Sequence, residues 1–310
     1  MITVKTGALM TATSAPEPRG LLAPLRIPNF RLLWIGIGTS ALGDHFAYIA
    51  LPWLALELTG DPFTVGLTRT MTGLAMAVFM LFGGALTDRL SPRRIMIASN
   101  ASLCLICFVA AALLYADAFT VPLLLTLAFL FGAGAAFFDP AYYAVFPHLL
   151  EPEDIGPGNA LMGLTFQLTG AIGPGLAGAL IATVGVGAAL AADGATFAVA
   201  VIALLLMRPI TRKGPSTEAD EPSEGTEASG LFADMRAGFA YVFTDPRLRV
   251  LALVIFAIGA VQSPTIGVGT TLLAGDRFGG SASAFGILIA GFGLGSVAGT
   301  AWAGSRYAPG

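Results

Sequence analysis

The chain alternates long apolar runs with short polar connections. Each run holds about 20 or more mostly apolar residues, the length that an α-helix needs to cross a bilayer. Prolines and glycines occur inside several runs, and membrane helices tolerate both because neighbouring helices satisfy the freed backbone groups. We therefore predict an all-α polytopic membrane protein whose spans cover residues 31–59, 63–87, 95–115, 121–147, 158–184, 187–207, 248–276 and 282–305.

The composition agrees with membrane spans. Hydrophobic residues make up 55% of the chain and charged residues 11%, and the mean hydropathy is +0.79. A soluble domain carries roughly 25% charged residues, so this chain has too few to cover a water-facing surface. Its two lysines follow no phosphate-binding loop, and its few histidines and cysteines indicate neither a metal site nor a disulfide framework. We expect no cofactor, no metal, no catalytic residue and no nucleic-acid or nucleotide partner; the lipid bilayer is the partner that the composition implies.

The positive charges of the chain segregate strongly. If the N-terminus lies in the cytoplasm, all of the 16 Lys and Arg residues except Arg69 and Arg277 fall on the cytoplasmic side. Cytoplasmic connections of membrane proteins carry an excess of Lys and Arg. The pattern therefore predicts a multi-pass membrane protein with a cytoplasmic N-terminus.

The polar segments divide the chain into four parts. Residues 1–29 read as a disordered cytoplasmic tail, and residues 30–208 as a six-helix transmembrane half. Residues 209–247 begin with a linker rich in Pro, Ser and acids and continue as an amphipathic helix on the cytoplasmic membrane surface. Residues 248–310 supply two further transmembrane helices.

The connection between the second and third spans has the pattern G-x-L-x-D-R-x-x-x-R, formed by Gly84, Leu86, Asp88, Arg89 and Arg93, with Arg94 directly after it. This pattern resembles the loop signature between the second and third helices of major facilitator superfamily transporters. Ser91 and Pro92 stand where that family usually has a glycine and an arginine. The resemblance implies that these residues gate the cytoplasmic side, with Asp88 bridging the two halves of the transporter.

A second motif lies in the fifth span, where Gly170, Gly173, Pro174 and Gly178 resemble the helix-bend signature of antiporters of the same superfamily. Small residues let helices approach closely, and a proline permits a bend. Ala177 and Thr169 depart from the signature. Ordinary small-residue packing between helices is the alternative reading.

Further residues resemble the branch of the superfamily that contains macrolide-efflux and siderophore-export proteins: Leu42, Gly43 and Asp44 with Ala50, Leu51 and Pro52, and Pro147 followed by Asn159 and Ala160. The resemblance covers residues 30 to about 305. It implies the major facilitator fold, here an N-terminal six-helix half plus the first two helices of the C-terminal half. The sequence is then truncated after its eighth membrane helix.

Charged residues inside spans are costly, so each is a functional candidate. Asp44 lies near the middle of the first span and is either a coupling or substrate-binding group or a structural acid. Arg69, nearer the outer end of the second span, either extends outward or pairs with Asp44 or an anionic substrate. For Asp139, near the cytoplasmic end of the fourth span, we favour a gating ion pair with Arg89, Arg93 or Arg94 over substrate binding. His45 faces away from Asp44 and is read as packing.

One residue expected of proton-coupled exporters is missing, because Ala128 occupies the place of their fourth-span arginine. Together the patterns favour a secondary active transporter that exports a small amphipathic molecule, such as a drug, macrolide or siderophore, by alternating access in exchange for protons. An importer or facilitator of a small solute is the first alternative, since fold does not fix direction. A non-transporting membrane assembly protein or a membrane enzyme is the alternative of another class; the acids of the spans lie at different depths, which disfavours an enzyme.

Overall fold

The computed structural model describes residues 20–208, 243–279 and 281–307, and within them it contains helices and no strand. The predicted tail 1–29, apart from its last residues, and most of the predicted linker and amphipathic helix lie outside the described residues. The helices are η1 Ala23–Arg26, α1 Pro28–Thr59, α2 Pro62–Arg89, α3 Pro92–Tyr115, α4 Val121–Ala135, α5 Phe138–Leu149, α6 Pro152–Val184, α7 Val186–Leu206, α9 Pro246–Pro264, the π-helical turn η2 Thr265–Gly269, α10 Thr270–Arg277 and α11 Ala282–Tyr307.

Proline marks where many of these helices begin. A proline is the first residue of α1, α2, α3, α6 and α9, a position where its missing N–H costs nothing and its fixed φ suits the helix. Aspartates cap the N-termini of two of these helices. Asp61 accepts hydrogen bonds from the backbone N–H groups of Phe63 and Thr64, and Asp245 accepts one from that of Arg247 at 2.7 Å. Both are N-caps that satisfy free backbone donors.

Two predicted spans are interrupted. The predicted helix 121–147 consists of α4 and α5, which meet at Ala136 and Phe137. Pro140 explains the break, because its ring clashes with the carbonyl group four residues earlier, that of Ala136. The predicted span 248–276 likewise changes at Pro264 into the π-helical turn η2 before α10 continues.

The helices are long enough for a membrane protein. Five stretches of the described residues have both the length and the apolar composition of a membrane span: Pro62–Met80, Pro92–Tyr115, Val121–Leu149, Pro152–Val184 and Val186–Leu206. Helix α1 has 32 residues but carries Asp44 and His45 in its middle. Helices α9 to α11 occupy the place of the last two predicted spans.

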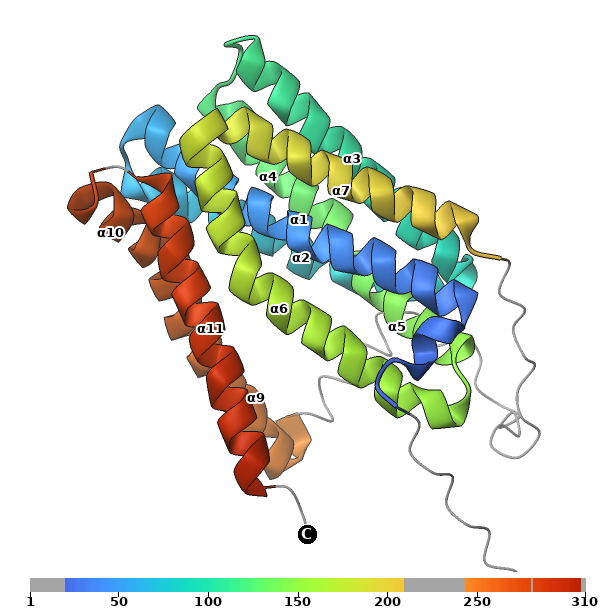
Figure 1. Cartoon of the computed structure of the whole chain (residues 1–310). Helices are drawn as coiled ribbons and strands as arrows, with labels where there is room; N and C mark the ends of the chain where they lie inside the picture. The colour runs from blue at the N-terminus through green and yellow to red at the C-terminus, as the bar shows by residue number, and fades with distance from the viewer. Residues whose placement is uncertain (1–19, 209–242, 280, 308–310) are drawn as a thin grey trace, which may run out of the picture.

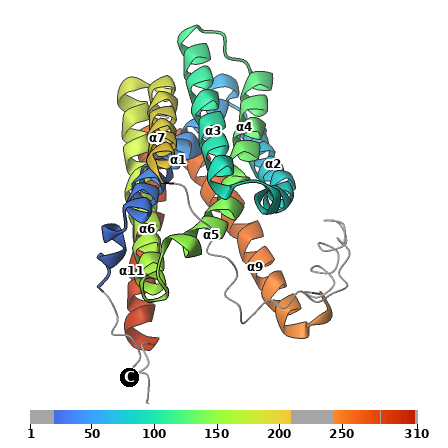
Figure 2. The ribbon, with the colours of Figure 1, turned by 90° about the vertical axis from the view of Figure 1, so that its right-hand side faces the viewer.

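The helices pack into a bundle in which α1 lies against α7 and α6, α3 lies against α7, and α2 lies against α4 (Figures 1 and 2). The last helix, α11, packs along α6. Figure 1 shows these two helices together near the C-terminal end of α6 and diverging toward the chain's C-terminus. The bundle therefore has one end at which its two parts touch and one at which they separate.

The buried side chains form a different core at each end. The core at the end where α1 finishes joins both parts of the chain, and Trp53 of α1 stacks on Phe285 of α11 with ring centroids 6.2 Å apart. Among the described side chains, the buried residues of the core at the end where α1 begins come from residues 30–207, with Phe30 packed edge-on against Phe146 of α5. Within the part of the chain that the structure describes, hydrophobic packing thus joins the two parts at the end where α1 finishes.

Candidate functional site: a carboxylate group at the centre of the bundle

Asp44 occupies the middle of α1 and its side chain is exposed to solvent. Its charge interacts with those of two other carboxylates, Asp139 at the start of α5 and Asp193 on α7. Three helices therefore carry three acids that lie near enough for the charge of Asp44 to be affected by those of the other two. Among the described residues no group of three or more such side chains is close enough to hold a metal ion.

Asp193 is the member of this group that the sequence analysis missed. It is fully buried on α7. Its carboxylate accepts hydrogen bonds from the Cys107 thiol of α3 at 3.6 Å and from the Thr196 hydroxyl at 3.4 Å. The criterion that selected Asp44, an acid inside an apolar run, would also have found it, since Asp193 lies within the predicted span 187–207.

A glycine on α1 makes room for the buried acid. A Cβ atom added to Gly43 would lie 2.7 Å from Oδ1 of Asp193 and would overlap the hydroxyl of Thr196. Such contacts are far shorter than van der Waals distances, so only glycine fits here without a shift. The packing of α1 on α7 beside Asp193 therefore depends on a glycine.

Arg69 of α2 binds α1 one helical turn from Asp44. Its Nη2 donates a hydrogen bond to the backbone carbonyl oxygen of Tyr48 at 2.7 Å, and its guanidinium carbon lies 3.6 Å from the centroid of the Tyr48 ring. The carbonyl is available because Pro52, four residues later, has no N–H to donate to it within the helix. Asp44 and Tyr48, four residues apart, share one face of α1. Among the described residues no hydrogen bond or ion pair joins Arg69 to Asp44.

The glycines of the antiporter-like motif provide close contacts for α6. The Cβ of an alanine at position 173 would lie 2.5 Å from the ring of His45, so Gly173 accommodates that histidine, and His45 does pack as predicted. A Cβ at Gly178 would lie 2.6 Å from the carbonyl oxygen of Ala282, and one at Gly286 of α11 would overlap the carbonyl oxygen of Pro174. One added at Gly170 meets nothing, but a Cβ at Gly293 would lie 2.6 Å from its carbonyl oxygen. Both helices therefore need small residues where they cross.

The loop signature is described in part. The side chains of Asp88 and Arg89 lie outside the described residues, and a Cβ at Gly84 would meet no neighbour. Arg93 donates from Nε to the carbonyl oxygen of Leu204 at 2.8 Å and from Nη2 to that of Leu205 at 2.9 Å. It thereby caps the C-terminal end of α7, where free carbonyl groups attract cations.

Arg94, by contrast, is exposed. Among the described side chains no ion pair joins Asp139 to Arg93 or Arg94, so the predicted gating pair with these two is not formed in this structure. Arg93 instead donates its hydrogen bonds to carbonyl groups of α7.

The described helices are long and apolar and form two parts. A charged loop joins the second and third spans, and glycines line a helix crossing. These features define a polytopic membrane protein of the major facilitator type. The chain belongs to the transmembrane secretion effector family, whose model matches residues 19–306. The predicted superfamily and its branch are thereby confirmed.

Curated relatives are bacterial exporters. The multidrug efflux pump Tap of Mycolicibacterium fortuitum is 28% identical over 226 residues, which cover 70% of this chain and 52% of the pump. The enterobactin exporter EntS of Shigella boydii serotype 18 is 30% identical over 232 residues, covering 73% of this chain and 52% of the exporter. That of Citrobacter koseri is 30% identical over 163 residues, 51% of this chain and 38% of the exporter. The chain spans about half the length of the curated relatives it matches, or less.

Proposed function

We propose that the chain acts in the export of a small amphipathic molecule across the bacterial inner membrane by alternating access. Membership of a secretion effector family and the similarity to drug and enterobactin exporters support this proposal. In this proposal residues 30–208 form one six-helix half, residues 209–247 a cytoplasmic linker, and residues 248–310 part of the second half, whose movement against the first exposes the central acids to alternate sides.

The observation that carries the proposal is the unequal closure of the bundle. The two parts touch through Trp53 and Phe285 and through the glycines of α6 and α11 at the end where α1 finishes. At the other end they diverge (Figure 1). With the N-terminus placed in the cytoplasm by the distribution of Lys and Arg, this corresponds to a conformation open to the cytoplasm, in which an exporter accepts its substrate.

In this proposal Asp44 couples transport to protons. It is the exposed member of three interacting carboxylates, whereas Asp193 is fully buried. Acids inside membrane helices mark proton relays, and like charges that lie near one another repel. A proton bound at Asp44 would lower the repulsion, and its release on the other side would restore it.

The test measures uptake into everted membrane vesicles from cells that produce the chain. The substrates are a cationic amphipathic dye and enterobactin, each with and without an imposed proton gradient. We expect gradient-driven uptake of at least one of them, and loss of that uptake in Asp44→Asn with unchanged amounts of protein in the membrane. The matched control is Asp117→Asn, an exposed loop acid at φ 51°, a conformation that asparagine also adopts.

Two results would count against the proposal. Uptake equal to that of vesicles without the chain would remove the transport function. Gradient-driven uptake that survives in Asp44→Asn would keep transport but assign proton coupling to another group.

A further inference from the structure

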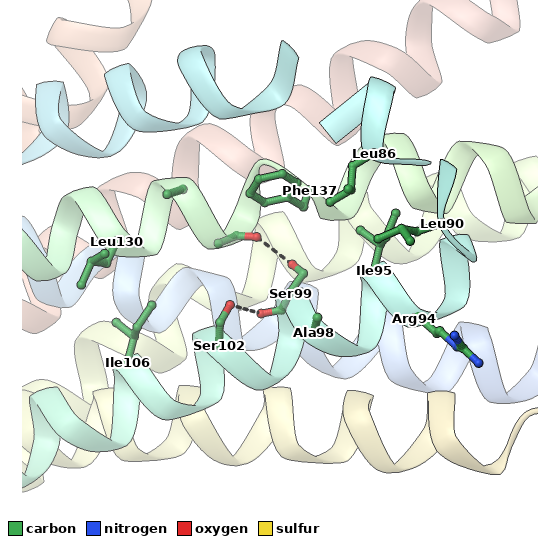
Figure 3. A pocket seen from close by; sticks show the side chains of 12 residues that line it. Leu86, Leu90, Arg94, Ile95, Ala98, Ser99, Ser102, Ile106, Leu130 and Phe137 are labelled. Carbon is green, nitrogen blue, oxygen red and sulfur yellow. Dashed lines mark hydrogen bonds between the residues drawn. The ribbon is translucent and has the colours of Figure 1, made fainter. Parts of the chain in front are cut away.

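A long apolar groove lies outside the central site, between the C-terminal part of α2, one face of α3 and α4 (Figure 3). Its cavity volume is about 550 Å³. The apolar lining includes Leu86 and Leu90 of α2, Ile95 and Ile106 of α3, Leu130 of α4 and Phe137 of the α4–α5 connection. No described side chain of α9 to α11 contributes to it.

The groove opens away from the centre of the bundle. The opposite face of α3 packs against α7, with Leu103 and Cys107 buried there. Figure 2 shows α3 at the periphery, between α7 and α4. Leu90 and Leu130 are exposed in the groove to 51% and 43%. In a membrane protein, such exposed side chains on a peripheral helix contact lipid.

The interior of the groove offers a ligand no free hydroxyl donor. Its two serines use their hydroxyl groups within the protein: Ser99 donates to the carbonyl oxygen of Gly134 at 2.7 Å, and Ser102 donates to that of Ser99 at 2.7 Å (Figure 3). A polar substrate would lose its hydrogen bonds to water here without replacement. An acyl chain would lose none.

Of the described side chains that line the groove, one is a cation, and it stands at the mouth. Arg94 lies at the end near the α2–α3 connection, remote from Ile106 and Leu130 (Figure 3). Its neighbour Arg93 is held by two carbonyl groups of α7, which fixes this end of α3. Arg94 itself is exposed and donates no hydrogen bond to any described residue. In the proposed orientation this end lies at the cytoplasmic headgroup level.

We propose that this groove is a binding site for an anionic phospholipid, with an acyl chain between α2, α3 and α4 and the phosphate group at Arg94. Basic pockets between membrane helices on the cytoplasmic side bind anionic headgroups. The charge of Arg94 at one end and the apolar length behind it match the two parts of such a lipid. The bound lipid would hold α2 against α3, two helices that make few direct contacts.

The experiment measures phospholipid retention by the purified 310-residue chain in detergent, using native mass spectrometry after titration with phosphatidylglycerol or phosphatidylcholine. We expect the unaltered chain to retain phosphatidylglycerol preferentially, and Arg94→Gln to weaken this retention about fivefold. Ala98→Phe, which fills the groove from an exposed position on α3, should reduce retention of both lipids. Arg31→Gln is the matched control, since Arg31 is exposed at the same end of the bundle on α1.

Several outcomes would overturn the proposal. Equal retention by Arg94→Gln and Arg31→Gln would exclude Arg94 as the headgroup site. Unchanged retention in Ala98→Phe would exclude the groove. Displacement of the lipid by inorganic phosphate alone would assign Arg94 to free phosphate, and displacement by the amphipathic dye would make the groove a substrate site. None of these depends on whether the chain transports a substrate.

Discussion

At the scale of single residues, the contact between Arg69 and Tyr48 depends on a missing backbone donor. Pro52 leaves the Tyr48 carbonyl without its helical partner, and Arg69 of α2 supplies the hydrogen bond at 2.7 Å. The guanidinium also lies over the Tyr48 ring, a cation–π arrangement. Arg69 therefore links α2 to α1, and its guanidinium is held about one helical turn from Asp44.

This dependence predicts a non-additive pair of substitutions. Arg69→Ala should lower the free energy of unfolding by about 1 kcal/mol, because it leaves the Tyr48 carbonyl, inside a span, without a donor. In a Pro52→Ala background the same change should cost less, because the introduced alanine supplies the N–H group from within the helix. A double-mutant cycle measured by unfolding in sodium dodecyl sulfate tests this coupling. Strictly additive effects would show that Pro52 and Arg69 act independently.

Gly43 provides a second residue-level prediction. An alanine there would press its Cβ against Thr196 and against Oδ1 of Asp193, so Gly43→Ala should destabilise the protein by about 1–3 kcal/mol. Gly73→Ala on α2 is the control, because a Cβ at Gly73 meets nothing within 4 Å. That change should be neutral or stabilising by up to about 1 kcal/mol. The same unfolding assay compares them, and equal effects would contradict the tight fit around Asp193.

At the scale of helices, the sequence predicted well which helices exist and roughly where each begins and ends, because both properties depend on local signals. The length of an apolar run identifies a span. Five helices begin at a proline within a few residues of the predicted start, at positions 28, 62, 92, 152 and 246. The break between α4 and α5 was missed although Pro140 carries its local cause. An apolar run that contains a proline still has the composition of one continuous span. The helix ends near Ala136 because the ring of Pro140 clashes with the carbonyl group of that residue.

The site was predicted less completely, because its contacts join distant parts of the chain. Asp44 and Asp139 were selected as candidates because they are acids within spans, but that they lie near one another depends on how α1 and α5 pack. Arg93 was named as one of three possible partners of Asp139, whereas it binds the carbonyl groups of Leu204 and Leu205, more than 100 residues away. No local pattern shows that the start of α3 lies beside the end of α7.

At the scale of the whole molecule, the proposed cycle requires the contact between α6 and α11 to open. These helices cross through glycines at one end, where Gly175 and Ala290 lie close enough that a Cβ at Gly175 would be 3.7 Å from that of Ala290. This separation matches the Cβ–Cβ distance of a disulfide, about 3.8 Å. Toward the other end the helices diverge, and a Cβ at Gly163 or at Gly299 would meet no neighbour within 4 Å.

We therefore predict that the pair Gly175→Cys and Ala290→Cys forms a disulfide on mild oxidation, in a chain whose Cys104 and Cys107 are replaced by alanine. The pair Gly163→Cys and Gly299→Cys, placed further along the same antiparallel register, should stay reduced. Because the first bridge holds the bundle closed at the end where α1 finishes, it should stop any gradient-driven uptake, and a reductant should restore it. Mass determination of the oxidised chains and vesicle uptake measure the two effects.

Efficient bridging of the second pair would contradict the divergence of the helices, while undiminished uptake with the first bridge formed would show that transport does not require this end to open.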